Sequence, residues 1–189
     1  DTFNPQVTVR EVQDNFRPAL GFVQRRGVRL LRLGGGFNPR PKNLLNIQQM
    51  SHDFYFTRFT RLATGDVESW DFYATLLDWH FKSGDNLHAV FDFNPTYERL
   101  SAPFAISPGV VLLPGEYRFT RWRHNVATAQ KRRLQGSTSW SFGRYWSGHA
   151  QTLQTGLTYK LPPRFTISFT TNQTFARLPQ GHFTARILG

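Results

Sequence analysis

The densest group of basic residues in the sequence lies between positions 117 and 133, interleaved with Tyr117, Phe119 and Trp122. Arginine binds phosphate and aromatic rings stack on bases, so this composition is typical of a surface for single-stranded nucleic acid. In an outer membrane the same residues would contact lipid phosphates or attract anions into a polar lumen. The candidate anion contacts are Arg118, Arg121, Arg123, Lys131, Arg132 and Arg133.

A second candidate is a pair of histidines, His80 and His88, on either side of a turn at 82–86. On paired antiparallel strands they could approach each other, with Asp78 nearby. Metal sites need three or four converging ligands, and this spacing supplies too few. We therefore predict no metal or other cofactor, and we interpret these residues as part of a polar lumen or rim.

Four carboxylates could in principle serve glycoside cleavage, which needs two carboxyl groups about 5–10 Å apart. They are Asp78, Asp92, Glu98 and Glu116, and nothing in their spacing places two of them together. No serine-nucleophile, phosphate-loop or zinc-protease motif is present. The absence of cysteine excludes a thiol nucleophile and a cysteine-bound metal. We do not expect an enzyme, and a carbohydrate-active enzyme is the third hypothesis.

Charge is distributed unevenly along the chain, whose net charge is +11. Residues 1–116 contain all twelve acids and twelve cations, whereas residues 117–189 contain eleven cations and no acid. Such a basic half attracts anions; alternatively, the cations are solvated or hydrogen-bonded within a β structure. A narrow, dry barrel could neutralise this charge only by pairing it with the acids of residues 1–116. If the protein is a membrane barrel, we expect a wider, water-filled one or many of these arginines, such as Arg121, Arg123 and Arg144, at its rims.

Alternation of apolar and polar residues with period two recurs from about residue 28 onward, and no long segment has helical spacing. In residues 165–175 the odd positions are mainly Phe and Ile, and the even positions are mainly Thr, Ser and Asn. Similar patterns cover 152–159, 134–146 and 87–94. Residues 70–81 are mixed on both faces, and weaker strands are expected at about 28–37, 52–61 and 117–127. These patterns predict an all-β protein, an antiparallel up-and-down meander of about eight long strands.

Turn signals separate the expected strands, and short connections at 83–86, 129–133 and 161–164 roughly alternate with longer ones. Short turns at one rim and longer loops at the other are typical of an outer-membrane barrel. A soluble β-sandwich also shows alternation, but these strands are long and their polar faces carry few Lys or Glu. Aromatic residues near strand ends are candidates for an interfacial girdle: Tyr97, Tyr117, Tyr145, Trp146 and Tyr159.

Residues 102–119, APFAISPGVVLLPGEYRF, resemble the long loop of a bacterial outer-membrane family. In that family an exported β-sandwich, similar to family 9 carbohydrate-binding modules, precedes a C-terminal β-barrel. The resemblance extends to residues 16–26, 37–41, 83–85 and 178–186. It implies a barrel without assigned catalytic residues, located in the bacterial outer membrane and contacting outer-membrane lipid or lipopolysaccharide.

This sequence departs from the family pattern in two ways. It contains no carbohydrate-binding-like module, so sugar binding does not transfer to these residues. It also stops at residues 187–189 as another strand begins, without a terminal aromatic residue. We therefore expect a segment of a larger barrel, with further strands or the carbohydrate-binding-like domain outside this chain. No export signal precedes Asp1, so we expect any such signal to have been removed.

The chain is thus predicted to comprise an N-terminal extension or preceding strand, residues 1–27, and a barrel region, residues 28–189. The leading functional hypothesis is an outer-membrane β-barrel, or part of one, with a structural and permeability role and an anion-attracting basic half. The alternative is a soluble basic β-protein that binds nucleic acid or another polyanion.

Overall fold

The computed structural model describes residues 2–17 and 25–189, with the side chains of 88–92 left out. The described residues form strands and connections, and the all-β prediction is confirmed. No helix long and apolar enough to span a membrane is found among them. The strands are β1 (Phe3–Val12), β2 (Val28–Phe37), β3 (Ile47–Arg61), β4 (Val67–Thr75), β5 (Asp78–Phe81), β6 (Asn86–Leu100), β7 (Phe104–Ser107), β8 (Val110–Leu112), β9 (Gly115–Ala127), β10 (Leu134–Tyr145), β11 (Gly148–Leu161), β12 (Phe165–Leu178) and β13 (Gly181–Leu188).

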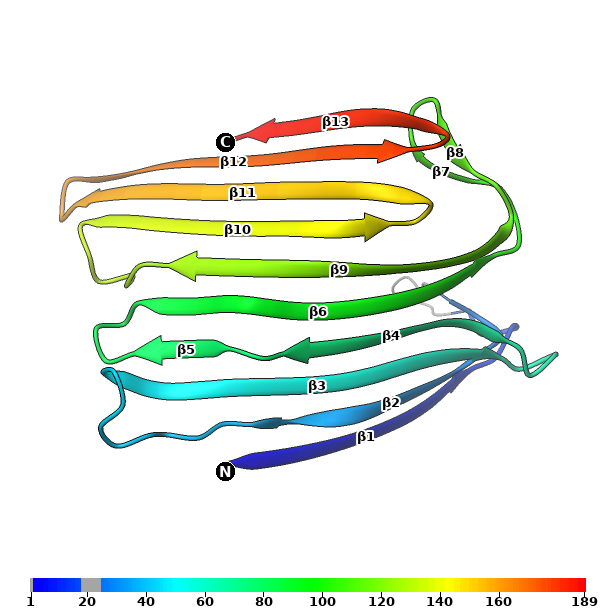
Figure 1. Ribbon diagram of the computed structural model, residues 1–189, viewed down its shortest axis with the longest axis horizontal. Helices are drawn as coiled ribbons and strands as arrows, with labels where there is room; N and C mark the ends of the chain where they lie inside the picture. Colours follow the sequence, from blue (N-terminus) through cyan, green and yellow to red (C-terminus); the bar gives the residue numbers. More distant parts are fainter. Residues whose placement is uncertain (1, 18–24) are drawn as a thin grey trace.

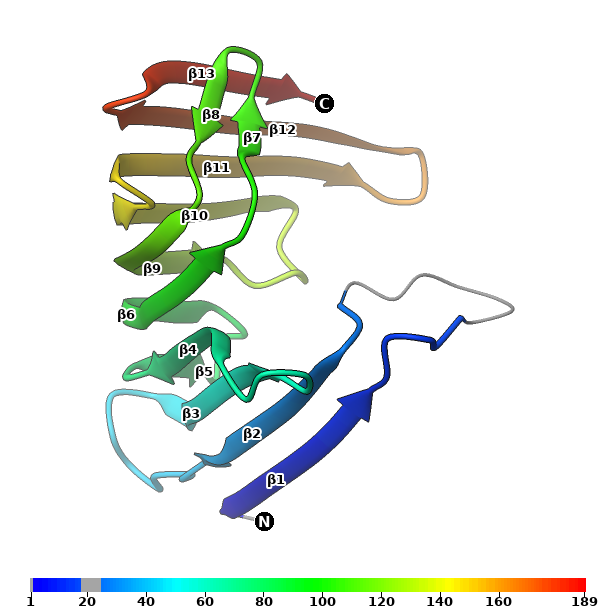
Figure 2. The same cartoon turned by 90° about the vertical axis from the view of Figure 1, so that its right-hand side faces the viewer.

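Eleven of these strands form one antiparallel meander, in the order β1-β2-β3-β4-β6-β9-β10-β11-β12-β13, with β5 between β3 and β6 (Figure 1). The sheet is curved, and β1 and β2 sweep out to one side of it (Figure 2). In the described part of the chain β1 and β13 are its two edges and do not pair with each other. The sheet has more strands than the eight expected, because β1 and β13 join it and residues 70–81 form two strands.

The mixed pattern of residues 70–81 has a structural cause. In β4, Trp70 lies opposite Tyr97, and Ala74 lies opposite Phe93. In β5, Trp79 lies opposite Leu87. Even-numbered residues therefore face the apolar neighbours in β4, and odd-numbered residues face them in β5. The chain breaks its alternation between the two strands, so neither face looks purely apolar in the sequence.

Side chains sort onto two distinct faces of the sheet, because directly opposed residues in an antiparallel pair lie on the same side. We call the side of the odd-numbered residues 165–169 in β12 the apolar face, and the side of the even-numbered residues 166–170 the polar face. Phe169 lies opposite Leu157, and Ser168 lies opposite Thr158. At the other end of the sheet, Leu33 lies opposite Val7 and Phe56. The apolar face is thus continuous over the whole meander.

Most exposed large hydrophobic side chains lie on this apolar face. The described part of the chain has 24 exposed large hydrophobic side chains. The strand register places sixteen of them on the apolar face. These sixteen are Phe3, Val7, Val9, Leu33, Phe37, Phe54, Val126, Leu134, Trp140, Leu153, Leu157, Tyr159, Phe165, Ile167, Phe169 and Leu188.

The two rims of the sheet both carry long and short connections. Rim A, on the right in Figure 1, has the connections 13–27, 62–66, 101–114, 146–147 and 179–180. Rim B, on the left, has 38–46, 82–85, 128–133 and 162–164. The expected segregation of short turns to one rim and long loops to the other is therefore not seen, because two-residue turns share rim A with the longest connections.

The 101–114 connection is a folded hairpin, where the sequence suggested a loop. Its strands β7 and β8 cross the rim A ends of the neighbouring strands (Figure 2). Leu112 is fully buried there with Ala150, Ala176 and Leu178, all on the polar-face side. The small hydrophobic core thus lies where this hairpin covers the polar face at rim A.

Candidate functional site

The middle of the polar face holds a polar cavity of about 550 Å³. The strand pairing brings the residues of this cavity side by side on the polar face. Tyr55 lies opposite both Gly34 and Tyr73, and Asn94 lies opposite Arg121. The cavity spans seven strands and is lined by Arg32, Tyr55, Thr57, Asp71, Tyr73, Asn94, Arg121, Trp122, Arg123, Ser141 and Thr152. Three arginines beside a single carboxylate make its lining net basic.

Close packing at Gly34 shapes one wall of this cavity. A Cβ atom at Gly34 would lie 2.0 Å from the Phe54 carbonyl oxygen and 2.6 Å from Cδ1 of Tyr55. The guanidinium of Arg32 lies over the Tyr55 ring, 4.2 Å from its centroid. Gly34 therefore permits close approach of neighbouring strands.

Gly34→Ala is expected to lower the free energy of unfolding by about 1–3 kcal/mol, because the added methyl group overlaps a backbone oxygen. Gly136→Ala is the matched control, since no atom lies within 4 Å of its Cβ position. Denaturant unfolding measures both changes. Equal stability of the two variants would contradict the packing described for Gly34.

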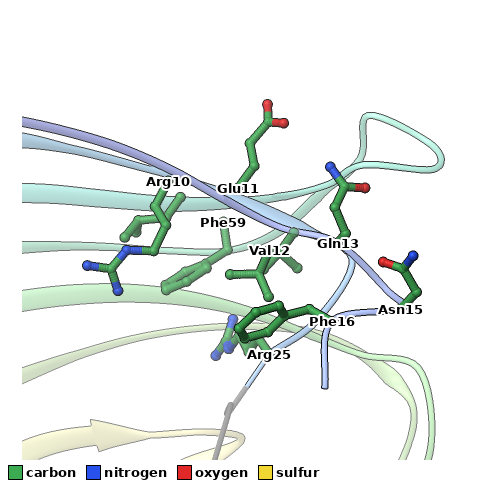
Figure 3. Close-up of a pocket in the computed structure, with 10 residues that line it drawn as sticks. Arg10, Glu11, Val12, Gln13, Asn15, Phe16, Arg25 and Phe59 are labelled. Carbon is green, nitrogen blue, oxygen red and sulfur yellow. The ribbon is translucent and has the colours of Figure 1, made fainter. Parts of the chain in front are cut away.

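Next to this cavity, the end of the β1–β2 connection is anchored to the polar face by Arg25. Its guanidinium donates a hydrogen bond to Ser69 and lies 3.3 Å from a carboxylate oxygen of Glu98 and 3.5 Å from one of Glu68. It also lies 4.5 Å from the centroid of the Phe59 ring. Figure 3 shows Arg25 and Phe16 at a cavity of about 740 Å³ between this connection and the sheet. Arg25 and Phe16, in the described ends of this connection, therefore lie over the polar face at rim A.

The structure separates the six predicted anion contacts into three places. Arg121 and Arg123 lie on the polar face, at the cavity. Arg118 lies on the apolar face, 5.5 Å from the Tyr97 ring centroid. Lys131, Arg132 and Arg133 lie in the 128–133 connection at rim B. Side chains alternate between the two faces along a strand, so residues 118 and 121 lie on opposite faces. The six basic residues therefore do not form one stacking surface.

Arg121 is held in place by two contacts on the polar face. Its Nη1 atom donates a hydrogen bond of 2.7 Å to the Ala150 carbonyl oxygen, and its guanidinium lies 5.5 Å from the Tyr145 ring centroid. The side chain therefore reaches across two strands and presents its charge at a fixed place on the polar face.

The five predicted girdle residues are also divided. Tyr97 and Tyr159 lie on the apolar face. Tyr117, Tyr145 and Trp146 pack against the core cluster beneath the β7–β8 hairpin, with 5.4 Å between the ring centroids of Tyr117 and Trp146. These three rings sit beneath the hairpin because the 101–114 connection folds back and offers them apolar partners. The apolar residues of 104–112 were the signal for this contact.

The histidine and carboxylate candidates form local pairs. His80 Nε2 lies 3.2 Å from Asp78 Oδ1, and Asn86 donates to the same oxygen at 3.0 Å. The side chains of His88 and Asp92 lie outside the described residues. Within the described part of the chain no three metal-ligating side chains converge.

Glu98 and Glu116 lie on opposite faces of the sheet. Glu98 is on the polar face with Arg25, whereas Glu116 lies opposite Arg99, which donates to it at 2.9 Å. These two carboxylates therefore cannot act as an acid and base on one glycosidic bond.

Asp85 joins two connections at rim B. Its carboxylate accepts hydrogen bonds from Ser83 Oγ and from the Ala129 backbone N–H, both at 2.7 Å, and from Arg132. These contacts, the Ser83 hydrogen bond first, lower the pKa of Asp85 below its ordinary value. The cation Arg132 is thereby held by a partner within the chain.

This lowered pKa predicts a pH dependence of stability. Because the folded state favours the ionised carboxylate, its contribution is present above the unfolded pKa of about 4 and is lost as pH falls through the folded value. Asp85→Asn should therefore destabilise the protein at neutral pH, with a difference from wild type that shrinks in acid. Unfolding measured across pH tests this. A constant difference, or one matched by the exposed turn variant Asp66→Asn, would refute it.

Comparisons with protein-family models, with curated proteins and with solved structures find no match. The resemblance of residues 102–119 and the other segments to an outer-membrane family stays a prediction, and residues 18–24 of its 16–26 segment lie outside the described residues.

Proposed function

We propose that this chain forms part of the wall of a bacterial outer-membrane β-barrel with a structural and permeability role. The observation that carries the proposal is the sorting of side chains described above, with exposed apolar side chains on one face of β1–β3 and β9–β13 and a polar face behind them. Soluble monomers rarely expose apolar patches of such extent. Contact with lipid would make the exposure of this apolar face energetically favourable. The antiparallel pairing satisfies the backbone hydrogen bonds between strands, as the hydrocarbon region of a membrane requires.

The polar face suits a water-filled interior. Over β10 to β12 it carries Ser, Thr, Gln and Asn, which pair across strands, for example Thr152 with Thr174 at 3.1 Å and Thr158 with Ser168 at 3.0 Å. It has little apolar surface to bury against a second sheet away from rim A. In a barrel this face would line the lumen, where the cavity arginines attract anions.

The positions of the cations agree with a wide barrel. Among residues 117–189, seven of the eleven lie in a connection or within one residue of a strand end: Lys131, Arg132, Arg133, Arg144, Lys160, Arg164 and Arg177. Open sheet edges do not occur in the hydrocarbon region of a membrane. The proposal therefore includes further strands that pair with the outer edges of β1 and β13.

Extraction tests the proposal. The protein should stay with the membrane fraction through high-salt washing and be released by detergent. Recovery as a monodisperse monomer in high-salt buffer without detergent would contradict it. If that soluble monomer bound oligonucleotides with an affinity that falls steeply with salt, the polyanion-binding alternative would replace it.

Permeability provides a separate prediction. Arg121→Gln combined with Arg123→Gln should lower the preference of the conductance for anions severalfold, because both cations face the interior. Arg118→Gln is the matched control, since it removes a cation from the same strand on the apolar face. The reversal potential under a salt gradient in planar bilayers measures the preference, and an equal shift for the control would contradict the assignment of faces.

A further inference from the structure

A row of cations and histidines crosses the outside of the last four strands at rim A. Arg144 of β10 lies opposite His149 of β11, His149 lies opposite Arg177 of β12, and Arg177 lies opposite His182 of β13. Directly opposed residues share a face, so the four side chains lie side by side on the apolar-face side of the sheet. All four are exposed.

This basic row has no anionic partner within the described part of the chain. Residues 117–189 contain no Asp or Glu. Among the described residues the hydrogen bonds and ion pairs involve other side chains, for example Arg99 with Glu116 on the neighbouring strands. Two arginines within one such row repel each other, and like charges across strands are destabilising. The row therefore favours an anion supplied from outside the protein.

The surroundings of the row specify the kind of anion. One register step nearer the middle of the sheet, Phe142 and Phe175 lie on the same face, both opposite Gln151. One step further toward the middle of the sheet, Trp140 lies opposite Leu153 on the same face. Two residues along a strand span about 7 Å, so the charged row borders directly on apolar side chains. A ligand that fits has a negative head group joined to hydrocarbon.

We infer that the row Arg144–His149–Arg177–His182 binds the phosphate groups of membrane lipids. Arginine forks match phosphate oxygens in geometry, and the neighbouring Phe and Trp rings contact the acyl chains below. Arg118 on β9, exposed at the same rim, extends the row along the sheet. This inference rests on the proposed membrane location and adds a lipid class and a place in the bilayer: rim A lies at the level of the head groups.

Binding to vesicles tests the inference with the full chain. Affinity is measured for phosphatidylcholine vesicles with and without added phosphatidylglycerol. The neutral vesicles report insertion alone, and the difference between the two vesicle types reports recognition of anionic lipid. A basic residue near an anionic surface contributes about 1 kcal/mol, or about fivefold in affinity. Arg144→Gln combined with Arg177→Gln should therefore lower affinity for the anionic vesicles about 25-fold and leave affinity for neutral vesicles unchanged. Arg144→Lys with Arg177→Lys, which keeps the charge, should retain most of the preference.

The control pair is Lys42→Gln with Arg164→Gln, which removes the same charge from exposed positions at rim B. Loss of the preference in this pair, or its retention in the Arg144 and Arg177 pair, would overturn the inference. Equal binding of the wild type to both vesicle types would also overturn it but leave the proposed function standing. Release of the wild type from the membrane fraction by high-salt washing without detergent would overturn the proposed function itself. Full displacement of the protein from anionic vesicles by an oligonucleotide would show a general polyanion site and reject lipid recognition.

Discussion

Replacing Phe169 by arginine is expected to raise the free energy of the membrane-inserted state by about 2–4 kcal/mol, the cost of a cation on the lipid side near the middle of a bilayer. Phe169 is 53% exposed and lies opposite Leu157 in the centre of the apolar face of β11 and β12. In the proposed arrangement its ring contacts lipid, so the substituted charge would have to enter hydrocarbon. Reversible unfolding from lipid vesicles measures the change.

Thr170→Arg is the matched control for this variant. Thr170 is the next residue of the same strand, is exposed, and faces the polar side opposite Gly156. An arginine there would extend into the water-filled interior at little cost. Similar destabilisation by the two substitutions would mean that both faces of β12 meet the same surroundings, which contradicts the proposed function.

The second large effect concerns the β7–β8 hairpin. Leu112 is fully buried against Ala150, Ala176 and Leu178, and Leu112→Ala is expected to lower the free energy of unfolding by about 2–5 kcal/mol through lost contacts and a residual cavity. Because the rings of Tyr117 and Trp146 pack on the same cluster, the hairpin should detach from the polar face. Denaturant unfolding, followed by tryptophan fluorescence, measures both consequences.

Leu113→Ala tests whether this effect belongs to the packed side chain. Leu113 follows Leu112 directly but is 64% exposed, so its truncation should change stability by only a few tenths of a kcal/mol. Equal losses for the two leucines would show that the hairpin does not pack on the polar face as described.

Local alternation was sufficient to predict the strands whose period of two is unbroken. Residues 165–175 are the clearest case, because every second residue from 165 to 169 is apolar and Thr and Ser lie between. Residues 70–81 were predicted as one mixed strand, because the apolar positions change parity between Ala74 and Trp79. The alternation along the sequence alone does not show where β4 ends and β5 begins, because this break is defined by how the two strands pair with their neighbours.

The candidate site was less accessible to sequence reasoning, because it depends on contacts between distant residues. The spacing of Arg121 and Arg123 correctly puts them on one face, but the same rule sends Arg118 to the other. The hairpin that covers Tyr117 and Trp146 was not predicted, because residues 102–119 resemble a long loop and contain Pro and Gly. The basic row from Arg144 to His182 becomes visible only from the register of four successive strands.

The central claim, that one face of the sheet meets lipid and the other meets water, can be tested residue by residue along β12. The chain contains no cysteine, so single cysteines introduced at positions 165–170 can each carry a spin label without interference. In native membranes the account predicts maximal accessibility to oxygen at Phe165, Ile167 and Phe169. It predicts maximal accessibility to a water-soluble nickel complex at Thr166, Ser168 and Thr170. Equal access of the nickel complex to all six positions, or odd positions shielded from both reagents, would contradict it.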